Sequence, residues 1–261
     1  MEQALDVIDA LARSDRARSL TELSQDTSMK PSKLHRYLVS LCARGLAKRV
    51  KDSGLYDLGP GALALGVTSL SRLDDFDTLR EAADRLSEQF RESSFVYVWT
   101  RTGPVLVHNR RPACALVNLR IGSVVPLISS ATGPVFVTYL DEAITRPILV
   151  RDCKAEGLDL AEICRHLREE ICPRIRAEEV NWSDVTIVPN SAACAAPVFD
   201  AQGDLIAVIG ISRYTRGIKA APRDKLRAAV QAEARAATRA LGYVARPGSP
   251  QFRKGRLVLK E

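Results

Sequence analysis

The chain has 261 residues and a formal net charge of +7 at pH 7, and 46% of its residues are hydrophobic and 26% charged. This is the profile of a soluble globular protein that is long enough for two domains. The sequence contains no apolar run of about 20 residues and no signal-peptide pattern at its start, so we expect a cytoplasmic protein with no membrane partner.

The cysteines and histidines show no metal-binding pattern. Six cysteines and three histidines are scattered along the chain, and no two cysteines form a Cys-x-x-Cys pair. Metal sites built from these residues have short, regular spacings. We therefore expect no metal site and no cofactor, and we expect the thiols to be reduced in a cytosolic protein.

The first 45 residues predict three helices. Apolar residues recur at helical spacing over residues 4–12, which indicates the first helix. Ser19 and Glu22 have the spacing of a capping box, which starts a second, short helix. The third helix is expected at residues 31–44, because it begins with a proline and is followed by Gly45, a good left-handed cap.

A β-hairpin is expected after the three helices. Two short extended runs, residues 46–50 and 55–58, flank a polar turn. Three helices and a terminal hairpin make a winged helix-turn-helix domain, which we assign to residues 1–59. A Gly-Pro-Gly break and a further apolar stretch then indicate a linker helix at residues 60–77.

The remaining chain predicts an α+β domain of the ligand-sensing kind. We assign residues 78–245 to this domain and residues 246–261 to a basic tail. The expected elements are, in order, a helix from residue 79, strands at 95–99 and 104–107, extended segments at 116–121 and 124–128, helices at 135–140 and 155–180, a hairpin of 195–199 with 205–211, and a helix at 225–241.

A basic stretch covers the third helix and the hairpin. Between Asp26 and Asp52 there are seven lysines and arginines and no acidic residue, so this stretch carries as much net charge as the whole chain. A solvated basic surface is one interpretation, and a phosphate-binding surface is the other. On a helical wheel, Leu34, Leu38 and Leu41 face the domain core, and polar and cationic side chains face outward.

The outward side chains suit DNA recognition. The major groove of B-DNA admits one α-helix, and its floor offers hydrogen-bond acceptors to arginine and lysine. Side chains of the wing are expected to contact phosphates or the minor groove. For the histidine of the third helix, a packing or solvent-exposed role is an equal alternative. The candidate DNA-binding residues are Ser32, Lys33, His35, Arg36 and Ser40 on the helix and Lys48, Arg49 and Lys51 on the wing.

An ordered set of motifs resembles the IclR family of bacterial transcription regulators. Ser32-Lys-Leu-His35-Arg36 and Tyr56-Asp-Leu-Gly59 resemble the recognition helix and the end of the wing in that family. Gly122-Ser-Val-Val-Pro126-Leu127, and Ala195-Ala-Pro-Val-Phe-Asp200 before a strand ending in serine, are similar to its C-terminal motifs. Each motif is weak by itself, but the ordered set is specific and covers nearly the whole chain up to residue 245.

The resemblance implies a fold, partners and a second site. The fold is α+β, with an N-terminal winged helix-turn-helix, a linker helix and a C-terminal GAF-like effector-binding domain. The implied partners are a double-stranded DNA operator, a small organic acid as effector, and further copies of the chain in a homodimer or homotetramer. The effector-binding residues carried over from the family are Ser130, Ala131, Thr132, Gly133, Asp184, Cys194 and Ser212.

The effector site also has interpretations that rest on the residues alone. Thr132 and Gly133 precede a predicted helix, where a hydroxyl and backbone N–H groups can bind a carboxylate. Cys194 is alternatively a small buried residue, and Asp184 alternatively belongs to a loop or caps a helix. Two positions depart from the family pattern. Pro134 stands where members often have lysine, and a glycine, residue 210, stands where a polar residue is common. Both departures imply an altered or weaker ligand.

An enzyme is the competing class of function. The sequence has no Gly-x-Ser-x-Gly and no His-Glu-x-x-His motif, which leaves a thiol dyad of Cys194 with His108 or His166. Only the residue types support that dyad, so we expect a regulator and not an enzyme. The alternative is an enzyme or ligand-binding protein whose basic head contacts an acidic partner other than DNA.

Overall fold

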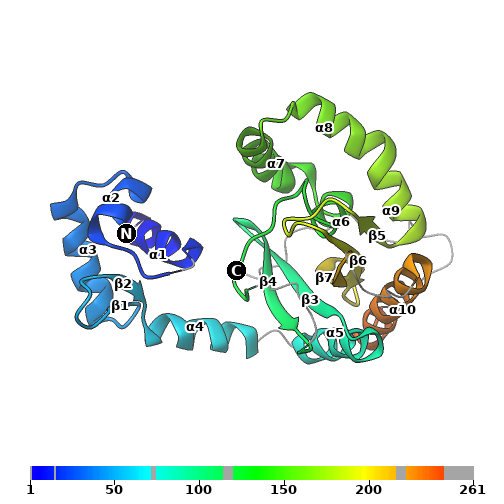
Figure 1. Cartoon of the computed structure of the whole chain (residues 1–261), viewed down its shortest axis with the longest axis horizontal. Helices are drawn as coiled ribbons and strands as arrows, with labels where there is room; N and C mark the ends of the chain where they lie inside the picture. The colour runs from blue at the N-terminus through cyan, green and yellow to red at the C-terminus, as the bar shows by residue number, and fades with distance from the viewer. Residues whose placement is uncertain (1, 15, 72–74, 114–119, 216–221, 244–261) are drawn as a thin grey trace. The chain divides into compact units, whose positions relative to one another are not determined.

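The computed structural model describes residues 2–14, 16–71, 75–113, 120–215 and 222–243. The basic tail at 246–261 and most of the extended segment expected at 116–121 lie outside these residues. The chain divides into two compact units, residues 1–76 and 77–261 (Figure 1). Among the described residues, none of the helices combines the length and the apolar run that a membrane span requires.

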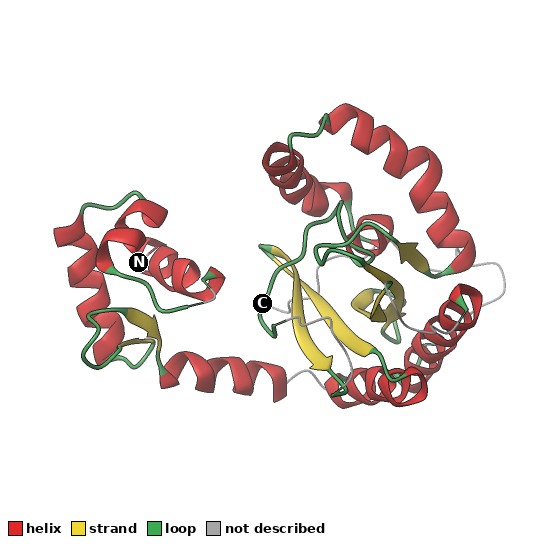
Figure 2. Ribbon diagram, in the orientation of Figure 1, coloured by secondary structure: helices red, strands yellow, loops and turns green. Residues whose placement is uncertain are grey.

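The small unit is a winged helix-turn-helix (Figure 2). Leu11, Leu23 and Leu38, one from each of the first three helices, share a single buried core with other apolar residues of these helices and of the hairpin. The expected fold of the N-terminal part is therefore confirmed. Its elements are α1 (Glu2–Arg13), α2 (Leu20–Thr27), α3 (Pro31–Ala43), β1 (Ala47–Arg49), β2 (Tyr56–Leu58) and α4 (Pro60–Ser71).

Local signals in the sequence set the ends of these helices. The Ser19 hydroxyl accepts a hydrogen bond from the Glu22 amide at 3.2 Å, and the Glu22 carboxylate accepts one from the Ser19 amide at 2.8 Å, so the capping box is confirmed. Ser28, at φ 54°, makes the tight turn between α2 and α3. Helix α3 ends one residue earlier than expected, and Gly45, at φ +69°, turns the chain into the wing.

The wing is a short antiparallel hairpin with an added edge. Lys48 of β1 lies opposite Asp57 of β2. Arg18, from the segment before α2, exchanges two backbone hydrogen bonds with Tyr56, at 2.8 and 2.7 Å. The wing is thereby fixed to the helices on its inner edge.

The large unit is built on one five-stranded antiparallel sheet in the order β4-β3-β7-β6-β5. Helices α5 and α10 pack on one face of the sheet, and α6 and α9 pack on the other (Figure 1). This confirms the expected α+β class. The elements are α5 (Phe76–Phe90), β3 (Ser93–Thr100), β4 (Gly103–Arg110), α6 (Gly133–Tyr139), α7 (Glu142–Glu156), α8 (Leu160–His166), a π-helical turn η1 (Leu167–Ile171), α9 (Cys172–Glu178), β5 (Asn181–Ser183), β6 (Ser191–Phe199), β7 (Leu205–Tyr214) and α10 (Arg223–Ala240).

Strand β6 lies between β7 and the edge strand β5 and is buried along its whole length. Cys194 and Ala196 face α5 and α10, whereas Ala193 and Ala195 face α6 and α9. Small side chains on both faces let helices approach the sheet from either side. The face to which each residue of this strand belongs decides which residues share the effector site.

Three expectations for the large unit need correction. The segment expected to be extended at 124–128 is mostly loop, with a single bridge between Val105 and Val124. The helix expected at 155–180 is interrupted by Gly157, at φ +68°, and contains the π-helical turn. Helix α7 was not predicted, and it continues through Pro147. The late hairpin and the last helix are confirmed, within two residues at the helix ends.

Candidate DNA-binding and effector-binding sites

The eight candidate DNA-binding residues are all exposed on the small unit. Leu34, Leu38 and Leu41 of α3 are buried, and they turn the opposite side of the helix toward solvent. The Ser40 hydroxyl donates to the Arg36 carbonyl at 3.2 Å, so it is engaged with its own helix in this structure. The predicted amphipathic arrangement of α3 is therefore present, and the wing continues its basic surface.

Ion pairing differs between the helix and the wing. Lys48 lies 3.6 Å from the Asp57 carboxylate on the opposite strand. Within the described part of the chain, Lys33, Arg36 and Arg49 make no ion pair with an acidic side chain. Two arginines of the preceding segment are paired with acids of α2, Arg16 with Glu22 at 2.5 Å and Arg18 with Asp26 at 2.6 Å. Glu22 and Asp26 thus pair with arginines outside the candidate set, whereas Asp57 pairs with Lys48 of the wing.

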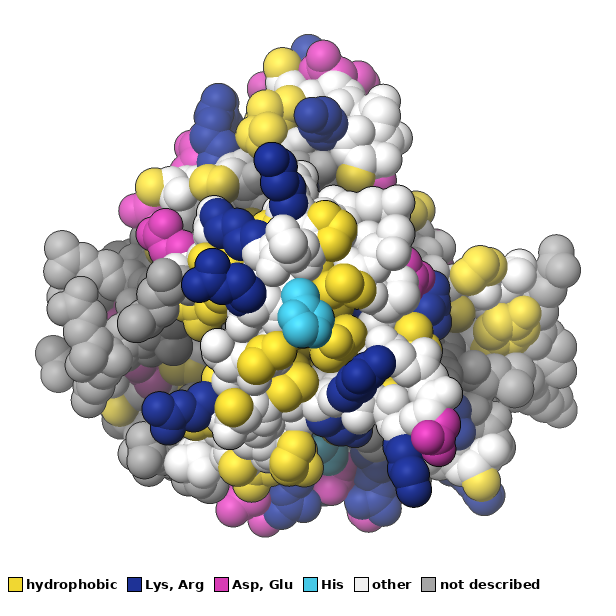
Figure 3. Space-filling view, turned by 90° about the vertical axis from the view of Figure 1, so that its left-hand side faces the viewer, with side chains coloured by type: hydrophobic (Ala, Val, Ile, Leu, Met, Phe, Trp, Pro, Cys, Tyr) yellow, Lys and Arg dark blue, Asp and Glu magenta, His cyan; other side chains and the backbone are white. Residues whose placement is uncertain are grey.

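The start of α3 is also electropositive. Its first turn has no acidic residue, and its N-cap, Lys30, makes no side-chain capping bond. Free amides and the helix dipole place partial positive charge at this end, and Lys33 adds a full charge. Figure 3 looks onto the side of the molecule that lies on the left in Figure 1, and it shows lysine and arginine side chains around a patch of hydrophobic side chains. This surface suits a polyanion.

In the large unit, the loop before α6 is closed by its own hydrogen bonds. The Ser130 hydroxyl donates to the Pro126 carbonyl at 2.7 Å and accepts from the Gly133 amide at 2.9 Å. The Ala131 carbonyl accepts from the side chain of Asn181 on β5 at 2.8 Å. These bonds hold the Ser130–Gly133 loop, named here the α6 loop, against the sheet. The Gly133 amide is already paired in this conformation.

The seven candidate effector residues do not lie on one side of the sheet. Ala131 belongs to the cluster under α6 and α9, whereas Cys194 belongs to the cluster under α5 and α10. The sheet therefore separates the α6 loop from Cys194. Ser212 of β7 pairs with Ala193 of β6, and paired residues of neighbouring strands face the same side of a sheet, so Ser212 lies on the α6 side.

Asp184 and Cys194 have structural roles on the far side. Asp184 accepts a hydrogen bond from the Trp182 indole at 2.9 Å and lies 3.9 Å from Arg223 of α10. The Arg223 guanidinium also lies over the Trp182 ring, 4.9 Å from its centroid. Burial raises the pKa of the Cys194 thiol to about 12, so this thiol is neutral and unreactive at pH 7. The proposed grouping of these two residues with the α6 loop is not what the structure shows.

Aromatic rings line the face of the sheet under α6. Phe95 and Tyr97 meet edge to face with centroids 5.3 Å apart, and Tyr139 and Phe199 do so at 5.1 Å. Burial raises the pKa of the Tyr97 hydroxyl, which keeps it protonated. Ser130 and Ser212, which are both buried, belong to the same side, and the Ser212 hydroxyl donates to the Ser93 carbonyl at 3.5 Å.

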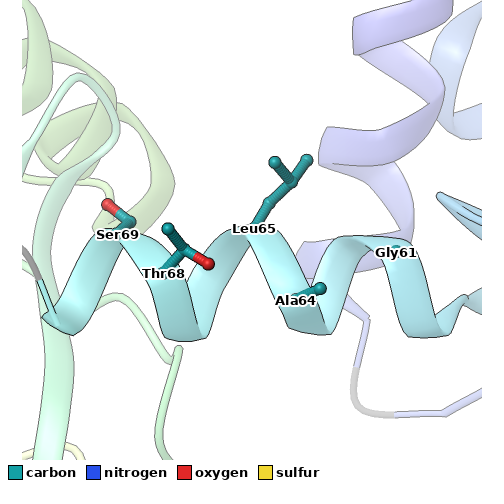
Figure 4. A pocket seen from close by; sticks show the side chains of 5 residues that line it. All are labelled: Gly61, Ala64, Leu65, Thr68 and Ser69. Carbon is teal, nitrogen blue, oxygen red and sulfur yellow. The ribbon is translucent and has the colours of Figure 1, made fainter.

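A separate apolar surface lies along α4. This helix has no charged residue, and none of its described side chains is buried. Leu63 and Leu65 are 68% and 64% exposed. A hollow along one side of the helix is lined by Gly61, Ala64, Leu65, Thr68 and Ser69 (Figure 4).

Two known domain families match the chain in the order of its units. The IclR helix-turn-helix domain matches residues 2–51, and the bacterial transcriptional regulator IclR C-terminal domain matches residues 67–239. The chain belongs to the IclR family. It is a DNA-binding transcriptional regulator with an effector-binding domain, and not an enzyme.

IclR-family relatives match over almost the whole chain. The glycerol operon regulatory protein of Streptomyces griseus is 28% identical over 256 residues, which span 93% of this chain and 96% of that protein. The crystal structure of HmgR from Pseudomonas aeruginosa is 30% identical with a TM-score of 0.57, covering 95% of this chain and 98% of that one. An IclR homolog from Microbacterium hydrocarbonoxydans, solved in complex with 4-hydroxybenzoate, shares the fold at 17% identity and a TM-score of 0.68, covering 91% and 98%.

The glycine at position 210, which departs from the IclR-family pattern, has a packing explanation. A Cβ atom there would lie 2.0 Å from the Cys194 carbonyl oxygen and 2.6 Å from the Phe95 ring. Phe95 fills the space that a polar side chain would need. Gly133 is similarly constrained, because its Cβ would lie 2.3 Å from the Cα atom of Leu127.

Sequence reasoning missed two polar residues that hold the α6 loop. Asn181 binds the loop directly, and the buried Asp152 of α7 accepts a hydrogen bond from the Leu127 amide at 2.8 Å. Neither residue lies in a motif that the resemblance covers. To find the role of Asp152 from the sequence, one would first have to predict helix α7, which Pro147 obscures.

Proposed function

We propose that this IclR-family regulator reads its operator with α3 and the wing. The observation that carries the proposal is that Lys33 and Arg36 are exposed on α3 and have no acidic partner in the part of the chain that the structure describes. Phosphates of a polyanion can pair with these cations, and an α-helix fits the major groove of DNA. In this proposal residues 1–59 bind DNA, residues 60–77 connect the domains, and residues 78–245 bind the effector.

The test uses the full-length protein and DNA selected from a random duplex library. We expect enrichment of one sequence, and we expect the logarithm of its binding constant to fall linearly with the logarithm of salt concentration. Equal, weak binding to all sequences at low salt would contradict specific operator recognition. It would favour the alternative in which the basic unit contacts a different acidic partner.

We propose a carboxylate-bearing small molecule as the effector, bound on the α6 side of the sheet. The hydroxyls of Ser130 and Ser212 and the aromatic lining of this side support an acid with an apolar body. Thr132 is buried beside them, and Ala131 and Gly133 complete the α6 loop. The complex of the Microbacterium hydrocarbonoxydans homolog with 4-hydroxybenzoate gives independent support for this ligand class. Asp184 and Cys194 are left out of this site.

A screen of small carboxylic acids by thermal denaturation tests the effector class. A true effector is expected to raise the melting temperature. It is also expected to change the affinity of the protein for its operator, and the operator should change the affinity for the effector by the same factor. Ser130→Ala should weaken ligand binding, and Cys194→Ala should leave ligand binding unchanged. Loss of binding in Cys194→Ala with retention in Ser130→Ala would place the ligand on the other side of the sheet.

We also propose that the regulator works as a homodimer or homotetramer joined in part through α4. The exposed, uncharged surface of α4 supports this, because apolar surface of this kind is normally covered by a partner. A dimer presents two α3 helices to half-sites one or more helical turns apart, and an effector that favours one arrangement changes their spacing.

Sedimentation of matched variants tests this assembly. Leu65→Glu on α4 is expected to shift the protein toward smaller species. Val185→Glu, at a side chain with nearly the same exposure (66% against 64%) in the large unit, is the control and should leave the assembly unchanged. Unaltered sedimentation of Leu65→Glu would remove α4 from the interface.

A further inference from the structure

The outer face of α3 carries one exposed large hydrophobic side chain, and binding of phosphates does not account for it. Val39 is 56% exposed, and it is the large hydrophobic side chain that α3 leaves in solvent. A β-branched residue favours a helix less than the alanine, lysine or arginine that usually occupy exposed positions. Its presence there calls for a partner that covers it.

The helical position of Val39 points to the same partner as Arg36. At about 100° per residue, Val39 lies within about 20° of Ser32 and about 60° of Arg36 around the helix axis. It points about 130° away from the stripe of buried leucines, farther than His35, which is at about 90°. Val39 is therefore on the outward face of α3, beside Arg36 and Ser32.

The chemistry around Val39 excludes a purely apolar partner. Arg36 and Lys33 lie on the same exposed side of α3, about 60° and 120° from Val39 around the helix axis, and neither has an acidic partner among the described residues. Figure 3 shows the same combination of hydrophobic and basic side chains on this side of the molecule. The floor of the major groove offers both kinds of contact, because guanine presents acceptors to arginine and thymine presents a C5-methyl group to apolar side chains.

We propose that Val39 is a specificity-determining residue that contacts the C5-methyl group of a thymine in the operator. The proposal rests on the proposed function, in which α3 lies in the major groove. Val39 is one helical turn from Arg36, an axial distance of about 4.5 Å, and successive base pairs are about 3.4 Å apart. The thymine lies one or two base pairs from the base that Arg36 contacts.

Removal of single methyl groups from the DNA tests this contact directly. The operator is first selected from a random duplex library with the wild-type protein, and each thymine is then replaced in turn by deoxyuridine, which lacks only the methyl group. For the wild-type protein, one such replacement is expected to weaken binding about three- to fivefold, the effect of exposing one methyl group to water. In Val39→Ala the same replacement should have no effect.

A matched variant separates this contact from general effects on the small unit. Leu5 of α1 has the same exposure as Val39, 56%, on a different helix. Leu5→Ala should keep the full dependence on the thymine methyl group. Circular dichroism should show both variants folded, since alanine favours a helix.

Two results would overturn the proposal. One is that no deoxyuridine replacement weakens wild-type binding more than twofold. The other is that a replacement does weaken it, but to the same extent in Val39→Ala. Either result leaves operator recognition by Arg36 intact, whereas failure to select any sequence would contradict the proposed function itself.

Discussion

The Asp152 carboxylate of α7 accepts a hydrogen bond from the backbone amide of Leu127 at 2.8 Å, in a buried position. The Arg151 guanidinium holds its other oxygen at 2.8 and 3.0 Å and also donates to the Thr102 carbonyl at 2.9 Å. One carboxylate thus ties α7 to the segment that leads into the α6 loop. The loop proposed to meet the effector is positioned from a helix that does not itself line the site.

Asp152→Ala is expected to destabilise the protein by about 1–3 kcal/mol, because it leaves a buried amide without an acceptor. Asp152→Asn, which keeps an acceptor oxygen, should cost less. Arg146→Ala on the same helix is the control, since its ion pair with Glu142 is exposed on both sides and does not involve Asp152. Denaturant unfolding measures all three. Wild-type stability in Asp152→Ala would show that the Leu127 amide finds another partner.

A second prediction concerns the close contact at Gly210. Gly210→Ala would force a Cβ atom into the Cys194 carbonyl and the Phe95 ring, and overpacking of this kind costs about 1–3 kcal/mol or more. Gly66→Ala on α4 is the matched control, because nothing lies within 4 Å of a Cβ atom there. That substitution should be neutral or stabilise by up to about 1 kcal/mol. Equal melting temperatures for the two variants would contradict the packing explanation.

The capping box makes the small unit sensitive to acid. Hydrogen bonds from the Ser19 amide and hydroxyl, and then from Arg16, lower the pKa of Glu22 from 4.5 to about 2. Since the pKa is lower in the folded state, the stabilisation is fully present above pH 4.5 and is lost as the pH falls toward 2. Glu22→Gln should therefore reduce the slope of the unfolding free energy against pH in this window. The slope near pH 7 should be unchanged. Parallel curves for the two proteins would argue against this assignment.

The ion pair on the wing predicts unequal contributions from two lysines. Lys33 is without an acidic partner among the described residues, whereas Lys48 lies 3.6 Å from Asp57. If both reach phosphates, Lys33→Ala should lower the slope of log affinity against log salt by about 0.9. Lys48→Ala should lower it by less, because Asp57 already neutralises part of its charge. Fluorescence anisotropy over a range of salt concentrations gives both slopes. A larger decrease in slope for Lys48→Ala than for Lys33→Ala would contradict this prediction and would indicate that the wing contributes more phosphate contact than the helix.

The small unit could be predicted from the sequence because its signals are local. Ser19 and Glu22 mark one helix start, a proline marks another, and Gly45 marks a helix end. Each signal acts through bonds within a few residues, so tertiary contacts do not override it. The leucines of α3 then fix which side of the helix is outside, and all eight candidate DNA-binding residues are exposed as expected.

The effector site could not be grouped correctly because β6 gives no alternation of polar and apolar residues. Its nine residues are all buried, so the sequence does not say which face each side chain takes. The register shows that Ala193, and not its neighbour Cys194, faces the α6 side. Helix α7 was missed for a different reason, since Pro147 inside it resembles a helix break.

Operator footprinting with Arg36→Ala tests the central claim most directly. The control is Arg146→Ala on α7 of the large unit, which removes the same charge from an exposed ion pair with Glu142. The wild-type protein and Arg146→Ala should protect the same selected operator at the same concentration. Arg36→Ala should lose that protection while keeping its melting temperature and sedimentation. Protection of the same sequence at the wild-type concentration by Arg36→Ala would contradict recognition of DNA through α3.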